Sequence, residues 1–152
     1  MVEIERKFLI HKDLWKPVGS GVEIRQGYLS VHPERVVRVR IAGEKAYITI
    51  KGKATGLVRP EFEYEIPKNE AEVLLKMCLD FPIEKIRFKE EIDGLIWEID
   101  VFKGANSGLI MAEVELSSEN QKVVLPDWSA EEVSNNFRYF NSWLSENPYT
   151  KW

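Results

Sequence analysis

The residues best suited to chemistry are pairs of like charges spaced two positions apart. Seven such pairs occur along the chain, each split by a single residue that is usually apolar. Side chains two apart on a strand point to the same face, so each pair predicts a strand with one charged face of a single sign. The anionic pairs are Glu3/Glu5, Glu61/Glu63, Glu98/Asp100 and Glu113/Glu115, and the cationic pairs are Arg38/Arg40, Lys51/Lys53 and Lys85/Arg87.

Two interpretations of these faces compete. A solvated sheet face also alternates charged and apolar residues, but it would be expected to mix signs, because opposite charges across strands contribute about 0.2 to 1 kcal/mol. In the second interpretation the faces turn inward around a polyanion and its metal ions. Carboxylates about 4 Å apart repel by roughly 4 kcal/mol at an effective dielectric of about 20, and a divalent metal would offset that cost. Lys and Arg rows would bind phosphate oxygens, as in metal-assisted phosphoryl chemistry.

The elements that must position these pairs are short strands joined by tight turns. The order is strands, one helix and strands again, without a βαβ series, and Asp93-Gly94 is typical of a hairpin. This order predicts an antiparallel sheet closed into a barrel. The expected strands cover residues 3–10, 22–30, 35–41, 46–53, 59–66, 82–92, 95–102 and 109–116.

Two helical segments are expected. Residues 69–72 resemble a capping box in front of the apolar run 73–79, and residues 129–132 resemble a second one. The segment after the second box carries an aromatic face that we interpret as a packing surface. Its members are Phe137, Tyr139, Phe140, Trp143 and Leu144.

Composition excludes several classes of protein. The 152 residues predict one domain, 1–152, and the net charge of −4 argues against a general nucleic-acid binder. The single cysteine, Cys78, lies in an apolar run and fits a structural role in a reducing compartment. No apolar run of 18 residues and no N-terminal apolar leader occur, so we expect a cytoplasmic protein without membrane contact. Neither His11 nor His32 has a second histidine at zinc-ligand spacing.

The first strand identifies a family. Glu3-Ile-Glu-Arg-Lys-Phe-Leu resembles the ExExK hallmark of the triphosphate tunnel metalloenzymes, the CYTH superfamily. The family implies an α+β fold: an eight-stranded antiparallel closed β-barrel, the triphosphate tunnel, with helices packed outside and here an aromatic C-terminal helix. The resemblance continues through 26–29, Arg38/Arg40, 50–51, 59–63, 84–87, 98–102, Glu113/Glu115 and 138–139.

The resemblance also implies roles for the charged residues. Lys7 and Tyr28 occupy the places of a catalytic pair in small bacterial members. A lysine acts as a base only if its pKa is lowered, so whether Lys7 takes a proton or orients water stays open. The family binds one or two divalent ions, Mg²⁺ or Mn²⁺. The implied phosphate ligands are Arg38, Arg40, Lys51, Lys53, Arg59, Lys85 and Arg87. The implied metal ligands are Glu3, Glu5, Glu113 and Glu115 first, then Glu61, Glu63 and Asp100, with Glu98 the least certain.

The compact chain is similar to bacterial members that act on inorganic tripolyphosphate or nucleoside triphosphates. We therefore expect metal-dependent hydrolysis of tripolyphosphate to pyrophosphate and orthophosphate. A class IV-type adenylate cyclase, a thiamine triphosphatase and a polyphosphate-binding module without turnover are the alternatives. The expected partner is a small-molecule triphosphate, not a nucleic acid, bound by a monomer or homodimer.

Overall fold

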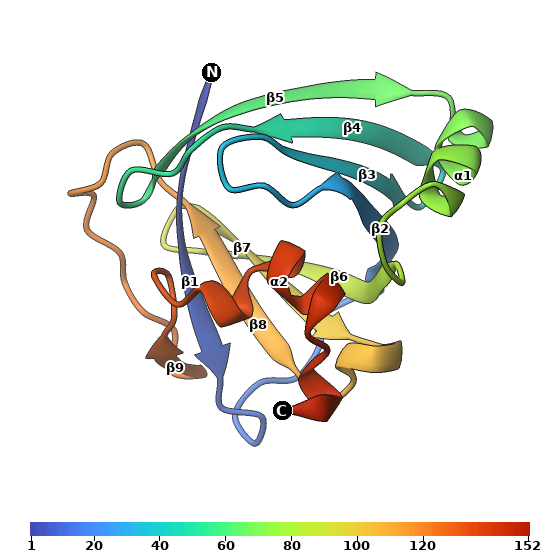
Figure 1. The fold of residues 1–152 in the computed structure, drawn as a ribbon. Coiled ribbons are helices and arrows are strands. Elements are labelled where there is room, and N and C mark those ends of the chain that lie inside the picture. Colours follow the sequence, from blue (N-terminus) through green and yellow to red (C-terminus); the bar gives the residue numbers. More distant parts are fainter.

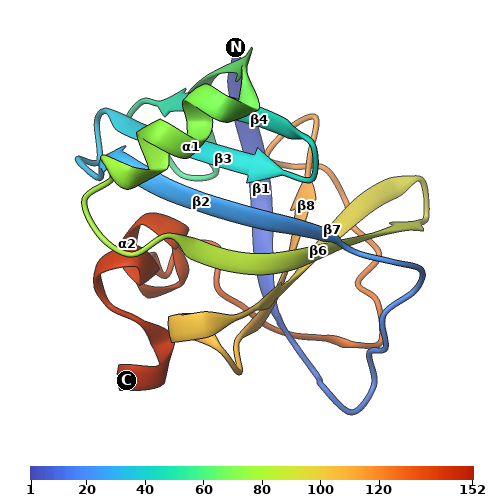
Figure 2. The same cartoon turned by 90° about the vertical axis from the view of Figure 1, so that its right-hand side faces the viewer.

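The chain forms a closed antiparallel barrel, seen here in a computed structural model that describes residues 1–152. Eight strands pair in the order β1-β5-β4-β3-β2-β6-β7-β8, and β8 pairs with β1, which closes the wall (Figures 1 and 2). The predicted barrel is thus confirmed. Its strands are β1 (Val2–Ile10), β2 (Val22–Ser30), β3 (Val36–Ala42), β4 (Lys45–Lys51), β5 (Val58–Ile66), β6 (Ile83–Ile92), β7 (Leu95–Phe102) and β8 (Ile110–Glu115).

Tight turns keep neighbouring strands adjacent along most of the wall. Asp93 and Gly94 join β6 to β7 with φ angles of 51° and 78°, the left-handed pair that matches the twist of a two-residue hairpin. The β1 strand makes the closure because its two halves have different partners. Val2–Ile4 pair with β5, whereas the second half pairs with β8 on one side and with β9 (Ser129–Glu132) on the other.

Much of the apolar core lies outside the barrel wall. Helix α1 (Lys68–Lys76) covers β3 and β4, where its Ala71 and Leu75 pack on Val39 and Ile41. A second cluster covers β1, β7 and β8 and is built around Trp97, which is fully buried. Because these clusters cover the outer face, the inner face is free to carry charge. None of the helices is long and apolar enough to cross a membrane.

The inside of the barrel is apolar at one end only. At this end the inward-facing side chains of the strands are hydrophobic. Leu144 of α2 (Asn141–Glu146) packs against them. Both ribbon views show α2 on the side of the C terminus (Figures 1 and 2). We call this cluster the apolar plug, since it closes that end of the interior. It consists of Tyr28, Val36, Ile83, Phe102, Leu109, Met111, Val133 and Leu144.

The C-terminal segment corrects part of the sequence prediction. Residues 129–132 are not a capping box but strand β9, and the aromatic face belongs to a 3₁₀ turn, Phe137–Tyr139, followed by the short α2. The physical reason is that β5 pairs only with the first residues of β1, so the remaining edge of β1 offers unpaired backbone groups. Arg6 fixes β9 further through a bidentate pair with Glu132, at 2.9 and 2.7 Å. Helix α1 likewise begins at Lys68 without a side-chain cap.

Gly27 allows α1 and the segment after it to approach β2 closely. A Cβ added at Gly27 would lie 2.7 Å from Cys78 Sγ and 2.9 Å from Cys78 Cβ. Gly27→Ala is therefore expected to lower the free energy of unfolding by about 1 to 3 kcal/mol. Adding Cys78→Ala should recover part of this loss, measured by urea unfolding of both single variants and the double variant. Strict additivity would contradict the proposed clash.

Candidate active site

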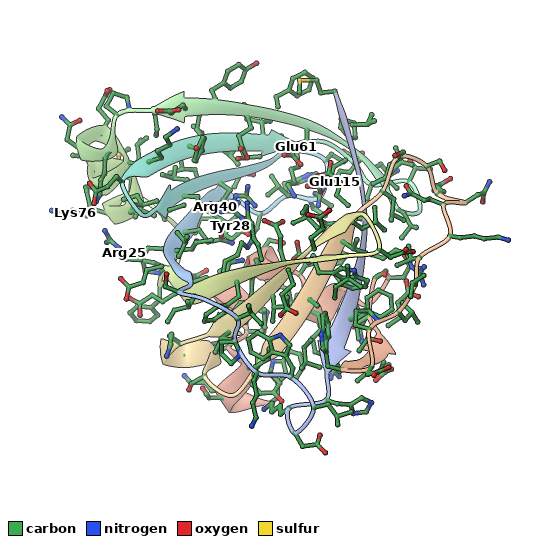
Figure 3. The ribbon with its side chains drawn as sticks, turned by 180° about the vertical axis from the view of Figure 1, so that it is seen from behind. Arg25, Tyr28, Arg40, Glu61, Lys76 and Glu115 are labelled. Carbon is green, nitrogen blue, oxygen red and sulfur yellow. The ribbon has the colours of Figure 1, made fainter.

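The polar part of the barrel interior is a cavity of about 660 Å³. Its lining side chains come from all eight barrel strands and from the C-terminal segment. In Figure 3, Tyr28, Arg40, Glu61 and Glu115 lie inside the ring of strands, whereas Arg25 and Lys76 lie outside it. The predicted site residues that line the cavity are Glu3, Glu5, Lys7, Tyr28, Arg38, Arg40, Lys51, Arg59, Glu61, Glu63, Lys85, Arg87, Glu113 and Glu115.

Two predicted residues do not line the cavity. Lys53 lies beyond the end of β4 and is exposed, so it is not placed with the other phosphate ligands. Asp100 is only 1% exposed and lies behind the cationic side chains. It accepts from Lys85 Nζ at 2.8 Å and from Arg87 Nε and Nη2 at 2.7 and 2.9 Å. Its oxygens serve as a counter-ion in this structure, which places Asp100 with the cationic side chains and not with the other predicted metal ligands.

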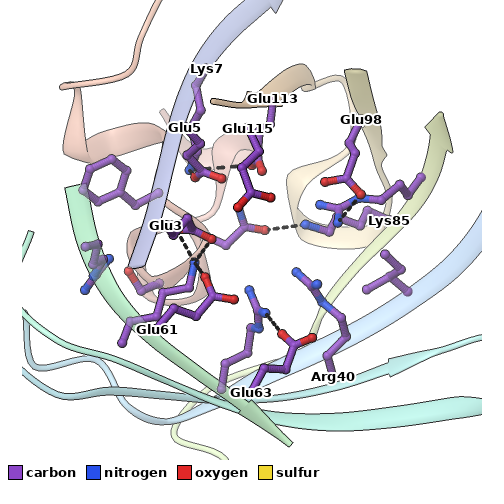
Figure 4. A pocket seen from close by; sticks show the side chains of 18 of the residues that line it. Glu3, Glu5, Lys7, Arg40, Glu61, Glu63, Lys85, Glu98, Glu113 and Glu115 are labelled. Carbon is purple, nitrogen blue, oxygen red and sulfur yellow. Dashed lines mark hydrogen bonds and ion pairs between the residues drawn. The ribbon is translucent and has the colours of Figure 1, made fainter. Parts of the chain in front are cut away.

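One wall of the cavity is acidic. Strand register places Glu5 opposite Glu115 and Lys7 opposite Glu113, so the β1 and β8 carboxylates gather on one surface (Figure 4). Lys7 Nζ lies 3.9 Å from Glu5 Oε1 and 3.7 Å from Glu113 Oε1. We call this surface the acidic wall, comprising Glu3, Glu5, Glu61, Glu113 and Glu115.

Lys51 completes the acidic wall from β4. Its Nζ donates to Glu3 Oε1 at 2.9 Å and lies 3.8 Å from Glu61 Oε2. No three acidic side chains converge at metal-ligand distances in this arrangement. The ammonium groups of Lys7 and Lys51 instead supply the neighbouring positive charge.

The acidic wall holds more negative charge than these lysines stabilise. Burial, and secondly the charge of Glu113, raise the pKa of Glu5 to about 8. Burial also raises the pKa of Glu3 and of Glu115. Burial alone would raise the pKa of Glu113 too, but the charges of Lys7 and Arg87 outweigh it and hold that pKa at about 2.

The excess negative charge and the oxygen donors of the acidic wall indicate whether a metal ion fits there. Glu61 Oε2 is buried without a hydrogen-bond partner, and its nearest cation, the Lys51 ammonium, is 3.8 Å away. Hard oxygen donors and excess negative charge are what Mg²⁺ and Mn²⁺ require. The donor set fits a divalent cation, provided that the carboxylates rearrange around it.

The raised pKa of Glu5 predicts a pH-dependent stability. Below pH 4.5 the carboxyl group is protonated in both states, but between pH 4.5 and about 8 it ionises only on unfolding, so rising pH destabilises the fold. Glu5→Gln removes this effect. In metal-free urea titrations we expect the variant to become more stable than wild type by on the order of 2 kcal/mol at pH 8, with no gain at pH 4. Glu65→Gln, at an exposed position near the end of β5 and outside the cavity lining, is the matched control. An equal gain there would contradict the assignment.

The opposite side of the cavity is cationic. We call it the cationic wall. Strand β3 supplies Arg38 and Arg40, and β6 supplies Lys85 and Arg87. Strand β2 lies between these two strands. Arg38 Nη2 donates to Thr49 Oγ1 at 3.2 Å, and its buried Nε has no partner. Burial, with the neighbouring guanidinium groups, lowers the pKa of Arg40 to about 9. Burial likewise lowers the pKa of Lys85 to about 7. Buried cations that suppress one another's charge are a site for an anion.

Arg59 differs from the other predicted phosphate ligands. Its Nε donates to the Gly52 carbonyl at 2.7 Å and its Nη2 to the Pro33 carbonyl at 3.3 Å. Arg59 therefore lies at the rim, where it links two loops, while still lining the cavity.

Lys7 and Tyr28 both line the cavity and are both buried, but no hydrogen bond joins them. Burial would lower the pKa of Lys7, yet the charges of Glu113 and Glu5 dominate and raise it. The ammonium also lies 5.0 Å from the centroid of the Phe140 ring. The Tyr28 hydroxyl accepts from Gln26 Nε2 at 3.3 Å. Lys7 is thus a protonated group suited to binding and orientation.

The sequence did not indicate four further lining residues of the C-terminal segment. These come from a segment expected to pack outside the barrel, and no local motif marks them as inward-facing. Lys89 also lines the cavity, and the alternation of charges on β6 could have indicated it. Glu98, the least certain of the implied metal ligands, lines the cavity as well. The C-terminal lining residues are Ser134, Phe140, Asn141 and Ser142.

A closed antiparallel barrel whose interior combines an acidic and a cationic wall defines the triphosphate tunnel class of proteins. The CYTH domain model matches residues 1–142, and the chain belongs to this family.

Named relatives cover nearly the whole chain. It is 46% identical to an inorganic triphosphatase of Acetivibrio thermocellus, over 97% of this chain and 95% of the relative. It is 37% identical to an inorganic triphosphatase of Nitrosomonas europaea, over 95% and 97%. The crystal structure of the inorganic triphosphatase NE1496 superposes with a TM-score of 0.67 at 35% identity, covering 94% of this chain and 93% of that one.

Proposed function

We propose that this protein hydrolyses inorganic tripolyphosphate to pyrophosphate and orthophosphate with Mg²⁺ or Mn²⁺. The observation that carries the proposal is the division of one cavity into facing acidic and cationic walls. Inorganic triphosphatase is the name of both sequence relatives and of the structural neighbour. The net charge of −4 favours a small anion held locally over a nucleic acid. The lone Cys78 supports a reducing cytoplasm.

The acidic wall is the proposed metal site. Glu3, Glu5, Glu113 and Glu115 supply its ligands from β1 and β8, and Glu61 adds from β5 an oxygen without a hydrogen-bond partner. Glu63 is a weaker candidate, because its Oε2 accepts from Thr49 at 2.9 Å and pairs with Arg38 at 3.4 Å. One or two bound divalent ions would polarise phosphoryl oxygens and lower the pKa of a bound water.

The cationic wall is the proposed phosphate site. Arg38, Arg40, Lys85 and Arg87 line the same space, Arg38 and Lys85 buried and Arg40 and Arg87 partly buried. They can therefore hold the triphosphate and stabilise charge that develops on it. Lys51 and Arg59 extend this set toward the rim.

Lys7 is the proposed orienting group. Because two carboxylates keep its ammonium protonated, we assign it to holding the attacking water and the transferred phosphoryl group, not to removing a proton.

Product analysis tests the proposed activity. Purified protein is incubated separately with tripolyphosphate, ATP and thiamine triphosphate, with Mg²⁺, Mn²⁺ or EDTA. We expect metal-dependent release of orthophosphate, fastest from tripolyphosphate. Cyclic AMP with pyrophosphate from ATP would instead show a cyclase, and binding of tripolyphosphate without any product would show a binding module. Either result would overturn the proposal.

A further inference from the structure

Asn141 occupies the boundary between the polar cavity and the apolar plug. It is the first residue of α2, lines the cavity and is only 9% exposed. Leu144, one turn later, packs in the apolar plug. Helix α2 therefore carries Asn141 to the closed end of the cavity, from outside the strands that supply the acidic and cationic walls.

Hydrogen bonds fix which way the Asn141 amide faces. Its Oδ1 accepts from Lys85 Nζ at 3.0 Å and from Gln26 Nε2 at 3.1 Å. Both partners are donors, so the oxygen and not the nitrogen must face them. Gln26 is itself held, because it is fully buried and its Oε1 accepts from Arg40 Nε at 2.9 Å.

The amide nitrogen of Asn141 is left with two N–H groups and no protein acceptor. Every hydrogen bond of the Asn141 side chain goes to its oxygen. The charged side chains anchored beside it, Lys85 and Arg40, are donors and cannot accept from it. The residue as a whole is nine-tenths buried, but this nitrogen is not sealed from solvent. It is therefore open to the cavity and can donate to an acceptor that enters there.

We propose that Asn141 is a substrate-binding residue, whose Nδ2 donates to an oxygen of the phosphate group at the closed end of the cavity. Its Oδ1 meanwhile holds the Lys85 ammonium toward that same group. This inference rests on the proposed function, and it adds to the cationic wall a neutral donor that comes from the C-terminal segment. Asn141 binds only the phosphate group that reaches the apolar plug.

Calorimetric binding of tripolyphosphate without metal tests this role. Asn141→Leu keeps the approximate size of the side chain but removes donor and acceptor, and we expect the Kd to rise about 10-fold or more. Asn135→Leu makes the same exchange at an exposed position of the same segment and should leave the Kd unchanged. An unchanged Kd in Asn141→Leu, with wild-type binding and turnover intact, would overturn this inference alone. No tripolyphosphate binding to wild type, either without metal or with Mg²⁺, would overturn the proposed function as well.

A second measurement separates contact from an indirect effect through Lys85. In ¹⁵N-labelled wild-type protein with bound tripolyphosphate, a correlation across the hydrogen bond should connect the Asn141 side-chain amide to ³¹P. A residue that only positions Lys85 would give no such correlation. Its absence in the fully bound protein would overturn the proposal, whatever the variants do.

Discussion

Replacing Lys7 by Met is expected to reduce kcat for tripolyphosphate hydrolysis about 10³-fold. The variant removes an ammonium group that lies within 4 Å of the Glu5 and Glu113 carboxylates. The charges of these carboxylates raise the pKa of Lys7. Lys7→Arg decides between the two roles, because a guanidinium keeps the positive charge but cannot act as a base. We expect Lys7→Arg to retain activity within about 10-fold of wild type.

Steady-state kinetics at saturating metal measure this comparison. Lys16→Met is the matched control, since Lys16 is exposed and does not line the cavity, and it should leave kcat unchanged. If Lys7→Arg were as inactive as Lys7→Met, Lys7 would be the general base and the orienting role would be wrong.

Asp100→Asn is expected to lower the free energy of unfolding by about 3 kcal/mol or more. Asp100 is the shared counter-ion of two buried cations, so neutralising it leaves Lys85 and Arg87 with uncompensated charge. The depressed pKa of Asp100 has the same physical origin: burial opposes ionisation, but the charges of Arg87 and Lys85 outweigh it. Tripolyphosphate should restore part of the loss, because it supplies negative charge to the same cations.

Urea unfolding with and without tripolyphosphate measures this effect. Glu98→Gln is the control on the same strand: Glu98 also pairs with Arg87, at 3.2 Å, but its side chain is 32% exposed. Its loss should stay below about 1 kcal/mol. Equal losses in the two variants would contradict the counter-ion role of Asp100.

The order of strands and tight turns predicted the barrel, and the single-sign charge pairs, with the family resemblance, predicted most of its inner face. The period of two on β1, β3, β6 and β8 determines which side chains share a face. A face with charges of one sign needs opposite charge across the cavity, from another strand, a metal ion or a phosphate. Asp100 shows the limit of this argument. It has the same inward parity as Glu98, but depth along the strand places it behind Lys85, and alternation carries no information about depth.

The C-terminal segment could not be predicted for a different reason. Its capping-box pattern at 129–132 is local, whereas the edge of β1 that recruits it as β9 exists only after the barrel has closed. The role of Asn141 likewise depends on contacts with Gln26 and Lys85, which are 115 and 56 residues away in sequence. Such long-range pairings override local propensity.

A crystal structure with Mn²⁺ and tripolyphosphate would test the two-wall assignment most directly, because anomalous scattering distinguishes the metal from the phosphates. We predict Mn²⁺ peaks at the carboxylates of Glu3, Glu5 and Glu113. We predict the triphosphate between these ions and the cationic wall, with one phosphate group at Lys85. Metal bound away from the acidic wall, or a triphosphate bound outside the cavity, would contradict the account.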